Sequence, residues 1–146
     1  MNNSDIIESL NDLVQITEDS RDGYHRSAED AKDADIKALF QDLATQRAGM
    51  VSELQNLVRQ LGGEPKDSGT ILAGAHRVYL DLKTAVTGQD RNAVIGSVEF
   101  GESEALRRYE NVLQKDLPSD VAMVVRRLHD RFRSDRDRVA QLRSAA

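Results

Sequence analysis

Glu99 and Glu102 are the residues of this sequence whose type and spacing most directly suggest chemistry. They lie three residues apart in a stretch that we expect to be helical, so both carboxylates project toward the same side. Glu102 also falls on the apolar face of that helix, which is formed by Val94, Val98, Ala105, Tyr109 and Val112. Because an unpaired buried charge is very costly, these acids need a partner: a metal ion, a reacting substrate or a cationic side chain.

Two further charged residues interrupt apolar helix faces. Arg47 lies on the apolar face of the second predicted helix, and Asp135 lies on that of the last. When each pair of helices is folded about its turn, near residues 34 and 117, Arg47 falls near mid-bundle and Glu99 falls level with Asp135. We therefore predict a buried or half-buried ion network of Arg47, Glu99, Glu102 and Asp135. Its expected polar neighbours are Thr17, Glu18, Arg21, Tyr24 and Tyr109.

Three interpretations of these acids compete. In the first, Arg47 neutralises them in a structural ion network, since such networks are common without chemistry. In the second, Glu99, Glu102 and Asp135 bind iron or another divalent metal. In the third, the paired glutamates perform acid–base catalysis, which requires a pocket open to substrate.

The residue types favour the structural network. A dinuclear carboxylate site in a helical bundle uses four acids and two histidines, with Glu-x-x-His on two helices. No Glu-x-x-His occurs in this sequence, and His25, His76 and His129 fall at other levels. An arginine in the layer would also repel a dication. We therefore expect no metal, no other cofactor and no enzyme activity, with the three-acid metal site as the alternative.

The helices that must position these residues are predicted from apolar residues at spacings of three and four. We expect helices over residues 5–32, 35–61, 70–87, 90–115 and 120–143. Asp5 with Glu8, Asp33 or Asp35, and Ser119 or Asp120 are the expected start signals, while Gly62-Gly63 followed by Pro65 ends the second helix. Four long helices with one long connection predict an all-α, ferritin-like antiparallel four-helix bundle, with the short helix 70–87 in the crossover.

The composition suits one domain spanning residues 1–146. There is no cysteine, which excludes disulfides and cysteine-bound clusters, and the net charge of −5 argues against general nucleic-acid binding. No apolar run approaches the roughly 20 residues that span a bilayer, and no signal peptide is recognisable, so we expect a cytoplasmic protein without membrane contact. The first 35 residues are acidic and the last helix is rich in arginine. These two segments are therefore expected to attract each other, either within one chain or across a homodimer.

Several short motifs carry a family resemblance. They are LNDL near the start, DGY at 22–24, QR at 46–47, GGEP at 62–65, SG and then HR within 68–77, and EFGE at 99–102 followed by Tyr109. Together, over nearly the whole chain, this order resembles bacterial ferritin-like four-helix-bundle proteins classed as a domain of unknown function. The resemblance implies the ferritin-like bundle with a helical crossover, and it implies no established activity. The missing Glu-x-x-His pairs set the sequence apart from iron-storing and di-iron members of that fold.

Overall fold

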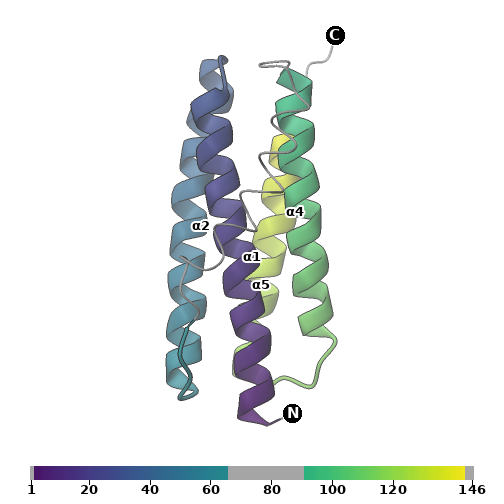
Figure 1. The fold of residues 1–146 in the computed structure, drawn as a ribbon. Coiled ribbons are helices and arrows are strands. Elements are labelled where there is room, and N and C mark those ends of the chain that lie inside the picture. The colour runs from purple at the N-terminus through teal and green to yellow at the C-terminus, as the bar shows by residue number, and fades with distance from the viewer. Residues whose placement is uncertain (1, 66–90, 144–146) are drawn as a thin grey trace.

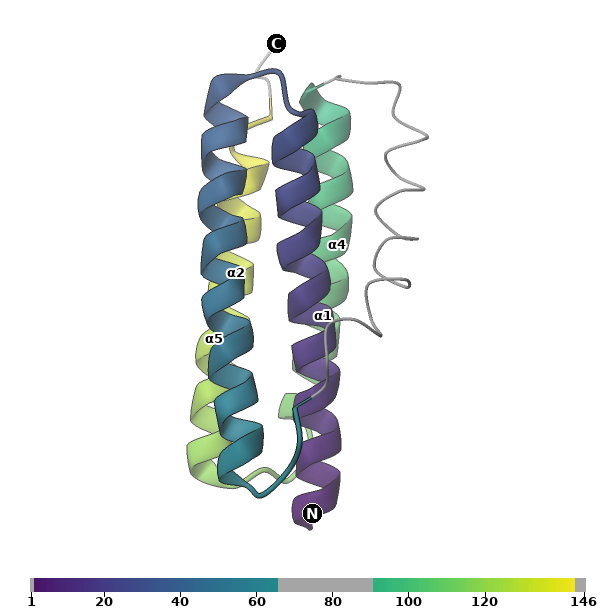
Figure 2. The same ribbon diagram turned by 60° about the vertical axis from the view of Figure 1, so that its left-hand side comes forward.

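Four long antiparallel helices form the bundle in the computed structural model, which describes residues 2–65 and 91–143. They are α1 (Asn3–Asp30), α2 (Ala34–Gln60), α4 (Arg91–Leu113) and α5 (Ser119–Ala140). α1 packs beside α2, α4 packs beside α5, and α1 also packs beside α4 (Figures 1 and 2). The predicted all-α four-helix bundle is confirmed, and the predicted helix 70–87 lies outside the described residues.

The predicted helix ends are within two or three residues of the observed ones, but the predicted capping residues are partly wrong. Asn2 is the N-cap of α1, and its side chain accepts the backbone N–H of Asp5 at 2.9 Å, so Asp5 itself lies in the first turn. Asp33 does occupy the N-cap of α2, but its side chain makes no cap bond. Its carboxylate instead pairs with Arg91 at 2.8 Å. Pro118, not Ser119 or Asp120, is the N-cap of α5.

The end of α2 follows the glycine signal in the sequence. Gly62 has φ of 85°, a left-handed conformation that favours glycine because it has no Cβ. The backbone N–H of Gly63 then bonds back to the carbonyl of Val58 at 3.0 Å. A Cβ at Gly63 would come within 2.7 Å of the Ile7 side chain. Glycine at both positions therefore lets the chain leave α2 while packing closely against α1.

The bundle core consists of two apolar clusters separated by a polar layer. One cluster, near the α4–α5 turn, includes Leu10, Leu13, Leu54, Val125 and Phe132. The other, toward the opposite end, includes Tyr24, Phe40, Leu43, Ile95 and Val139. On α2 the polar layer lies between Leu43 and Met50, at the position of Arg47. Each cluster excludes water from one side of the charged side chains between them.

Arg91 ties three segments together at the end of the bundle opposite the N-terminus. Its guanidinium pairs with Asp33 and Asp35, each at 2.8 Å, and its Nε donates to the carbonyl of Leu142 at 2.8 Å. The first helical turn of α4 is thereby joined to the α1–α2 turn and to the chain that follows α5. The paired guanidinium lowers the pKa of Asp35.

The length and hydropathy of the described helices bear on whether they could span a membrane. Within residues 2–65 and 91–143, no helix is both long and apolar enough to cross a bilayer.

Candidate functional site

Arg47 lies at the centre of the polar layer. It is 0% exposed and is the largest fully buried side chain among the described residues. Its two terminal nitrogens donate to two different acids: one to Glu102 Oε2 on α4 at 2.6 Å, the other to Asp135 Oδ2 on α5 at 2.9 Å. Its Nε donates to Ser20 Oγ on α1 at 3.0 Å. The network therefore takes one residue from each of the four helices.

The two acids have further partners. The Ser20 hydroxyl donates to Glu102 Oε1 at 2.6 Å, so both oxygens of that carboxylate accept a hydrogen bond. Arg131 Nε lies 3.3 Å from Asp135 Oδ2, and an Arg138 nitrogen lies 3.6 Å from Asp135 Oδ1. Both arginines are on α5 and half exposed. They bring additional positive charge to Asp135, whereas the second partner of Glu102 is the neutral Ser20 hydroxyl.

Aromatic rings enclose the guanidinium. The Cζ atom of Arg47 lies 4.0 Å from the centre of the Phe132 ring and 5.4 Å from that of Tyr24. Such contacts between a cation and a ring face are stronger when the cation is shielded from water. Burial by itself lowers the pKa of Arg47, but Glu102 and Asp135 outweigh that effect and hold it above its ordinary value. Arg47 is therefore permanently charged.

A second hydrogen-bonded pair borders the ion network. The hydroxyls of Thr17 and Tyr109 are 2.7 Å apart, and the Thr17 hydroxyl donates to the carbonyl of Leu13 at 2.6 Å. Tyr109 must then be the donor to Thr17. Burial raises the pKa of Tyr109, against smaller opposite effects of Thr17 and Arg47, so this tyrosine stays protonated.

Glu99 corrects one part of the sequence prediction. It does not join the buried layer: its Oε1 lies 2.6 Å from an Arg143 nitrogen, and its side chain is a quarter exposed. Three residues of α-helix turn by about 300°, so Glu99 is displaced around α4 by about 60° from Glu102. That rotation moves it from the bundle interior to the edge that faces the chain after α5.

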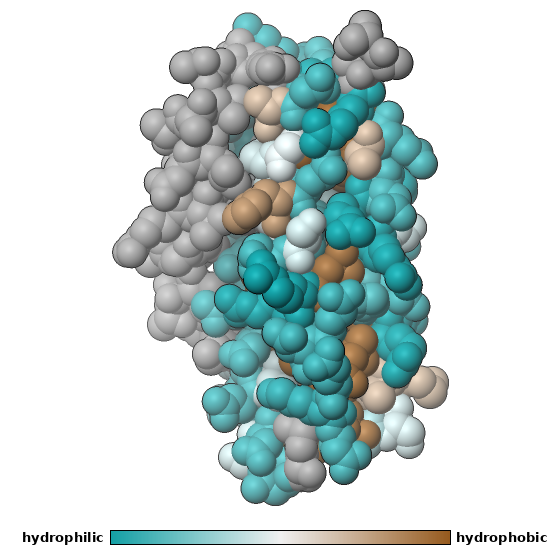
Figure 3. Space-filling view, turned by 90° about the vertical axis from the view of Figure 1, so that its right-hand side faces the viewer, coloured by the Kyte–Doolittle hydropathy of each residue, from teal (hydrophilic) through white to brown (hydrophobic). Residues whose placement is uncertain are grey.

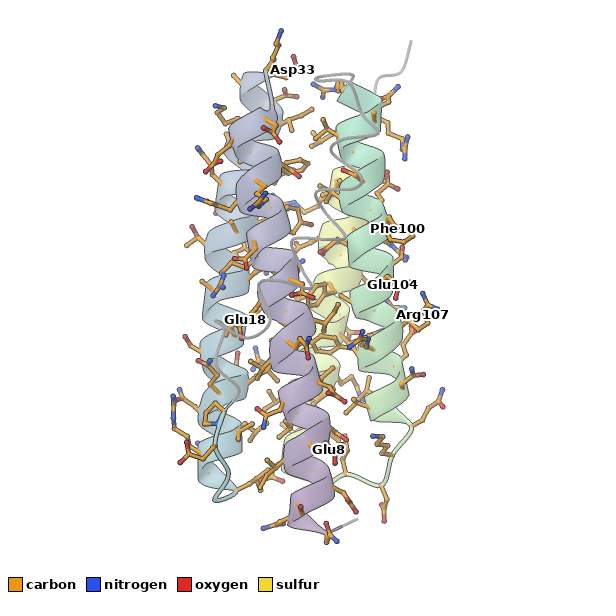
Figure 4. The ribbon with its side chains drawn as sticks, viewed as in Figure 1. Glu8, Glu18, Asp33, Phe100, Glu104 and Arg107 are labelled. Carbon is orange, nitrogen blue, oxygen red and sulfur yellow. The ribbon has the colours of Figure 1, made fainter. Side chains whose placement is uncertain are left out.

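The predicted polar neighbours separate into two groups. Thr17, Tyr24 and Tyr109 are fully buried around the network. Glu18 is also buried, but it pairs with Arg21 on α1 at 3.6 Å and not with Arg47. Arg21 Nε also bonds Asp22 at 3.0 Å. Figure 4 shows Glu18 on α1, and Phe100, Glu104 and Arg107 along the outer side of α4.

Ser20 is the functional residue that sequence reasoning missed. It is 2% exposed and contacts both Arg47 and Glu102. Its position, three residues after Thr17 and four before Tyr24, places it on the same face of α1. That spacing was a usable signal, although a serine carries no charge to draw attention to it.

The donor atoms in this layer do not suit a transition metal. The two buried carboxylates are already bound by Arg47, and no group of three His, Cys, Asp or Glu in the described ranges is arranged to hold an ion. The described histidines lie elsewhere, as the sequence predicted. His25 is near Glu29 at 3.3 Å, and His129 lies 3.1 Å from both Glu110 and Asp130. His76 is outside the described residues.

Asp19 is a half-buried acid on α1, outside the Arg47 network, whose pKa is shifted by its surroundings. Its Oδ1 has no hydrogen-bond partner among the described residues. Burial and the nearby Asp22 raise its pKa to about 7, against the opposing charge of Arg108. A group whose pKa is higher in the folded state favours folding when protonated, so this contribution is lost as pH rises from about 4 through 7.

We predict that Asp19→Asn stabilises the protein at pH 8 but not at pH 4. The amide carries no charge to desolvate, and solvent screening of this half-buried site limits the gain to about 1 kcal/mol. Urea unfolding of both proteins between pH 4 and 8 measures the difference. Asp12→Asn on the same helix is the control. A gain that does not change with pH would show that the Asp19 carboxylate is not the cause.

Comparison with known proteins places the chain in a family. The model of a domain of unknown function (DUF2383) matches residues 5–115. The chain belongs to this family. None of the curated proteins matched it.

Two solved structures share the fold of this family member. One is a two-domain protein from Anabaena variabilis with DJ-1/ThiJ/PfpI-like and ferritin-like domains. It is 21% identical with a TM-score of 0.78, and the match covers 100% of this chain but 42% of the Anabaena protein, so this chain spans about two fifths of its length. The other is a DPS protein from Vibrio cholerae, described as a member of a broad superfamily of ferritin-like diiron-carboxylate proteins. It is 16% identical with a TM-score of 0.71, over 96% of this chain and 87% of that one. These likenesses show the ferritin-like fold alone.

Proposed function

We propose that this chain is a non-catalytic helical-bundle protein in which an arginine-centred ion network stands in place of a di-iron site. The observation that carries the proposal is the position of the Arg47 guanidinium, which bonds to Glu102 and Asp135 at 2.6 and 2.9 Å. In a metal site those carboxylates would face a cation from solution. Here a side chain of the protein supplies the positive charge.

The ligand set supports this proposal over the metal-binding alternative. Di-iron sites of this architecture draw six ligands, four acids and two histidines, from the four helices. The buried layer has two acids, and the positions contributed by α1 and α2 are Ser20 and Arg47. A divalent ion between Glu102 and Asp135 would have to displace the guanidinium and then tolerate its charge nearby. Glu99, the third predicted ligand, faces Arg143 instead.

Burial supports a structural role over acid–base catalysis. The side chains of Arg47, Glu102 and Asp135 are each at most 1% exposed. A substrate has no access to carboxylates that are enclosed in this way, and both acids are already hydrogen-bonded. A general acid or base needs a reacting group within about 3 Å.

The network is suited to setting the alignment of the helices. Its polar atoms come from α1, α2, α4 and α5 at one level. A shift of any one helix by one turn would therefore leave a buried charged group without one of its hydrogen-bond partners. Buried polar groups have this register-setting effect in some helical assemblies, often without adding much stability. We infer that the layer specifies which residues of the two helix pairs face each other.

Metal analysis tests the proposal directly. The full chain, purified without chelator and then equilibrated with Fe²⁺ under anaerobic conditions or with Mn²⁺ or Zn²⁺, should retain no stoichiometric metal after gel filtration. Inductively coupled plasma mass spectrometry measures the content. Glu102→Ala is compared with Glu104→Ala, a half-buried position on the outer side of the same helix. Stoichiometric metal that is lost in Glu102→Ala but kept in Glu104→Ala would overturn the proposal and support the metal-binding alternative.

A further inference from the structure

We propose that the groove between α4 and α5 binds the acidic first turns of α1 from a second copy of this chain. The groove has a volume of about 450 Å³, and its walls include Leu113 at the end of α4, Gln114 just after it, and Arg126, His129 and Arg133 of α5. The proposed occupant is the acidic stripe, defined here as Asp5, Glu8 and Asp12. This inference concerns the outer surface and is independent of the proposed role of the buried network.

The groove is lined by two arginines, two acids and His129, and its arginines are only partly paired. Its two acids are engaged within it, because Glu110 and Asp130 each lie 3.1 Å from a ring nitrogen of His129. Arg133 is exposed and contacts Asp130 at 3.2 Å. Arg126 is exposed and forms no ion pair with any part of the chain that the structure describes. A partner that brings carboxylates to this groove would give Arg126 an ion-pair partner and add a second one for Arg133.

An exposed apolar residue extends the groove along α5. Met123 is 73% exposed, the highest value among the large hydrophobic residues described. It lies three residues before Arg126, so the two side chains share one face of α5. Figure 3 looks onto the face formed by α4 and α5 and shows apolar side chains in a line between polar ones. An exposed apolar side chain beside an exposed arginine fits an amphipathic helix with an acidic edge.

The same chain carries a helix edge of that kind. Asp5, Glu8 and Asp12 are exposed or half-buried on α1 at spacings of three and four, which aligns them along one side. Asp5 and Asp12 are two helical turns apart, as are Arg126 and Arg133.

The net charges of the two helix pairs support a contact between copies. Residues 2–65 have 13 acidic and 6 basic side chains, a net charge of −7, whereas residues 91–143 have 9 acidic and 11 basic, a net charge of +2. Complementary potentials of this kind steer association and fix its orientation. They also make it sensitive to salt, because exposed charges are screened within about 10 Å at 0.1 M.

Sedimentation velocity of the full chain tests the proposal. At 20 mM salt the wild-type protein should self-associate as its concentration rises, and 500 mM salt should reverse this. Arg126→Glu with Arg133→Glu should weaken self-association by more than about tenfold. Lys32→Glu with Arg59→Glu, at exposed positions that do not line the groove, makes the same change in net charge and should have little effect.

A charge-reversal pair identifies the occupant. Asp5→Arg with Glu8→Arg and Asp12→Arg should also abolish self-association, and mixing this variant with the Arg126→Glu, Arg133→Glu variant should restore a complex. Circular dichroism confirms that each variant is folded. A wild-type protein that stays monomeric at low salt at all concentrations would overturn the proposal. So would self-association that survives the groove substitutions, or a mixture that forms no complex.

Discussion

Replacing Arg47 with methionine should destabilise the protein by about 3–5 kcal/mol at neutral pH, the typical cost of breaking a buried ion pair by removing one partner. Methionine fills much of the same space, so little of the loss would come from a cavity. The loss arises because Glu102 and Asp135 would remain buried with no guanidinium to bind them. The midpoint and slope of urea unfolding, measured at pH 7, give the change in free energy of unfolding.

The triple variant Arg47→Met, Glu102→Leu, Asp135→Leu is the control that separates charge from packing. It removes all three charges and leaves apolar side chains, and replacing a whole buried ion network in this way is often neutral or stabilising. We therefore expect it to recover most of the stability that the single change loses. If Arg47→Met alone costs less than about 1 kcal/mol, the acids must be neutralised by something other than this arginine.

Replacing Phe132 with alanine should cost about 3–5 kcal/mol, as truncation of a fully buried aromatic residue usually does. Phe132 is 0% exposed and joins the apolar cluster near the α4–α5 turn to the polar layer. Its ring packs against Tyr109 with centroids 5.1 Å apart and lies 4.0 Å from the Arg47 guanidinium carbon. The variant would lose apolar burial, the ring pair and the face that shields the cation. Urea unfolding at pH 7 measures the effect.

Two further substitutions provide the comparison for Phe132. Phe132→Leu keeps most of the apolar volume but loses the ring. The loss in free energy of unfolding that remains in this variant therefore measures the two aromatic contacts, with Tyr109 and with Arg47. Phe100→Ala removes an aromatic residue that is 51% exposed on the outer side of α4. Surface changes of that kind are usually within about 0.5 kcal/mol. Equal costs at positions 100 and 132 would contradict the described packing.

The similarity to solved structures concerns the backbone fold, whereas the ion network concerns the side chains at the centre of the bundle. The bundle architecture is shared with the Anabaena and Vibrio proteins at 21% and 16% identity. Because function depends on the groups at a site and not on the fold that holds them, the chemistry of Arg47, Glu102 and Asp135 is the better guide to what this bundle does.

The sequence by itself determined the four described helices and most of the charged interior. Apolar residues at spacings of three and four decide which side of a helix is buried. For Arg47, Glu102 and Asp135 that rule was sufficient, because each lies in the middle of an apolar face and is at most 1% exposed. The end of α2 could also be predicted from the sequence, because the left-handed conformation of Gly62 is a local property of the backbone.

The tertiary structure decided which polar groups meet. Glu99 lies only about 60° around α4 from Glu102, and periodicity alone does not resolve that angle into buried or exposed. The outcome depends on how α4 is rotated against α5, which brings Arg143 to Glu99. Ser20 joined the network for the same reason: its hydroxyl reaches Arg47 and Glu102 because α1 packs beside both α2 and α4. Local spacing sets the face of each side chain, while the packing of neighbouring helices sets its partner.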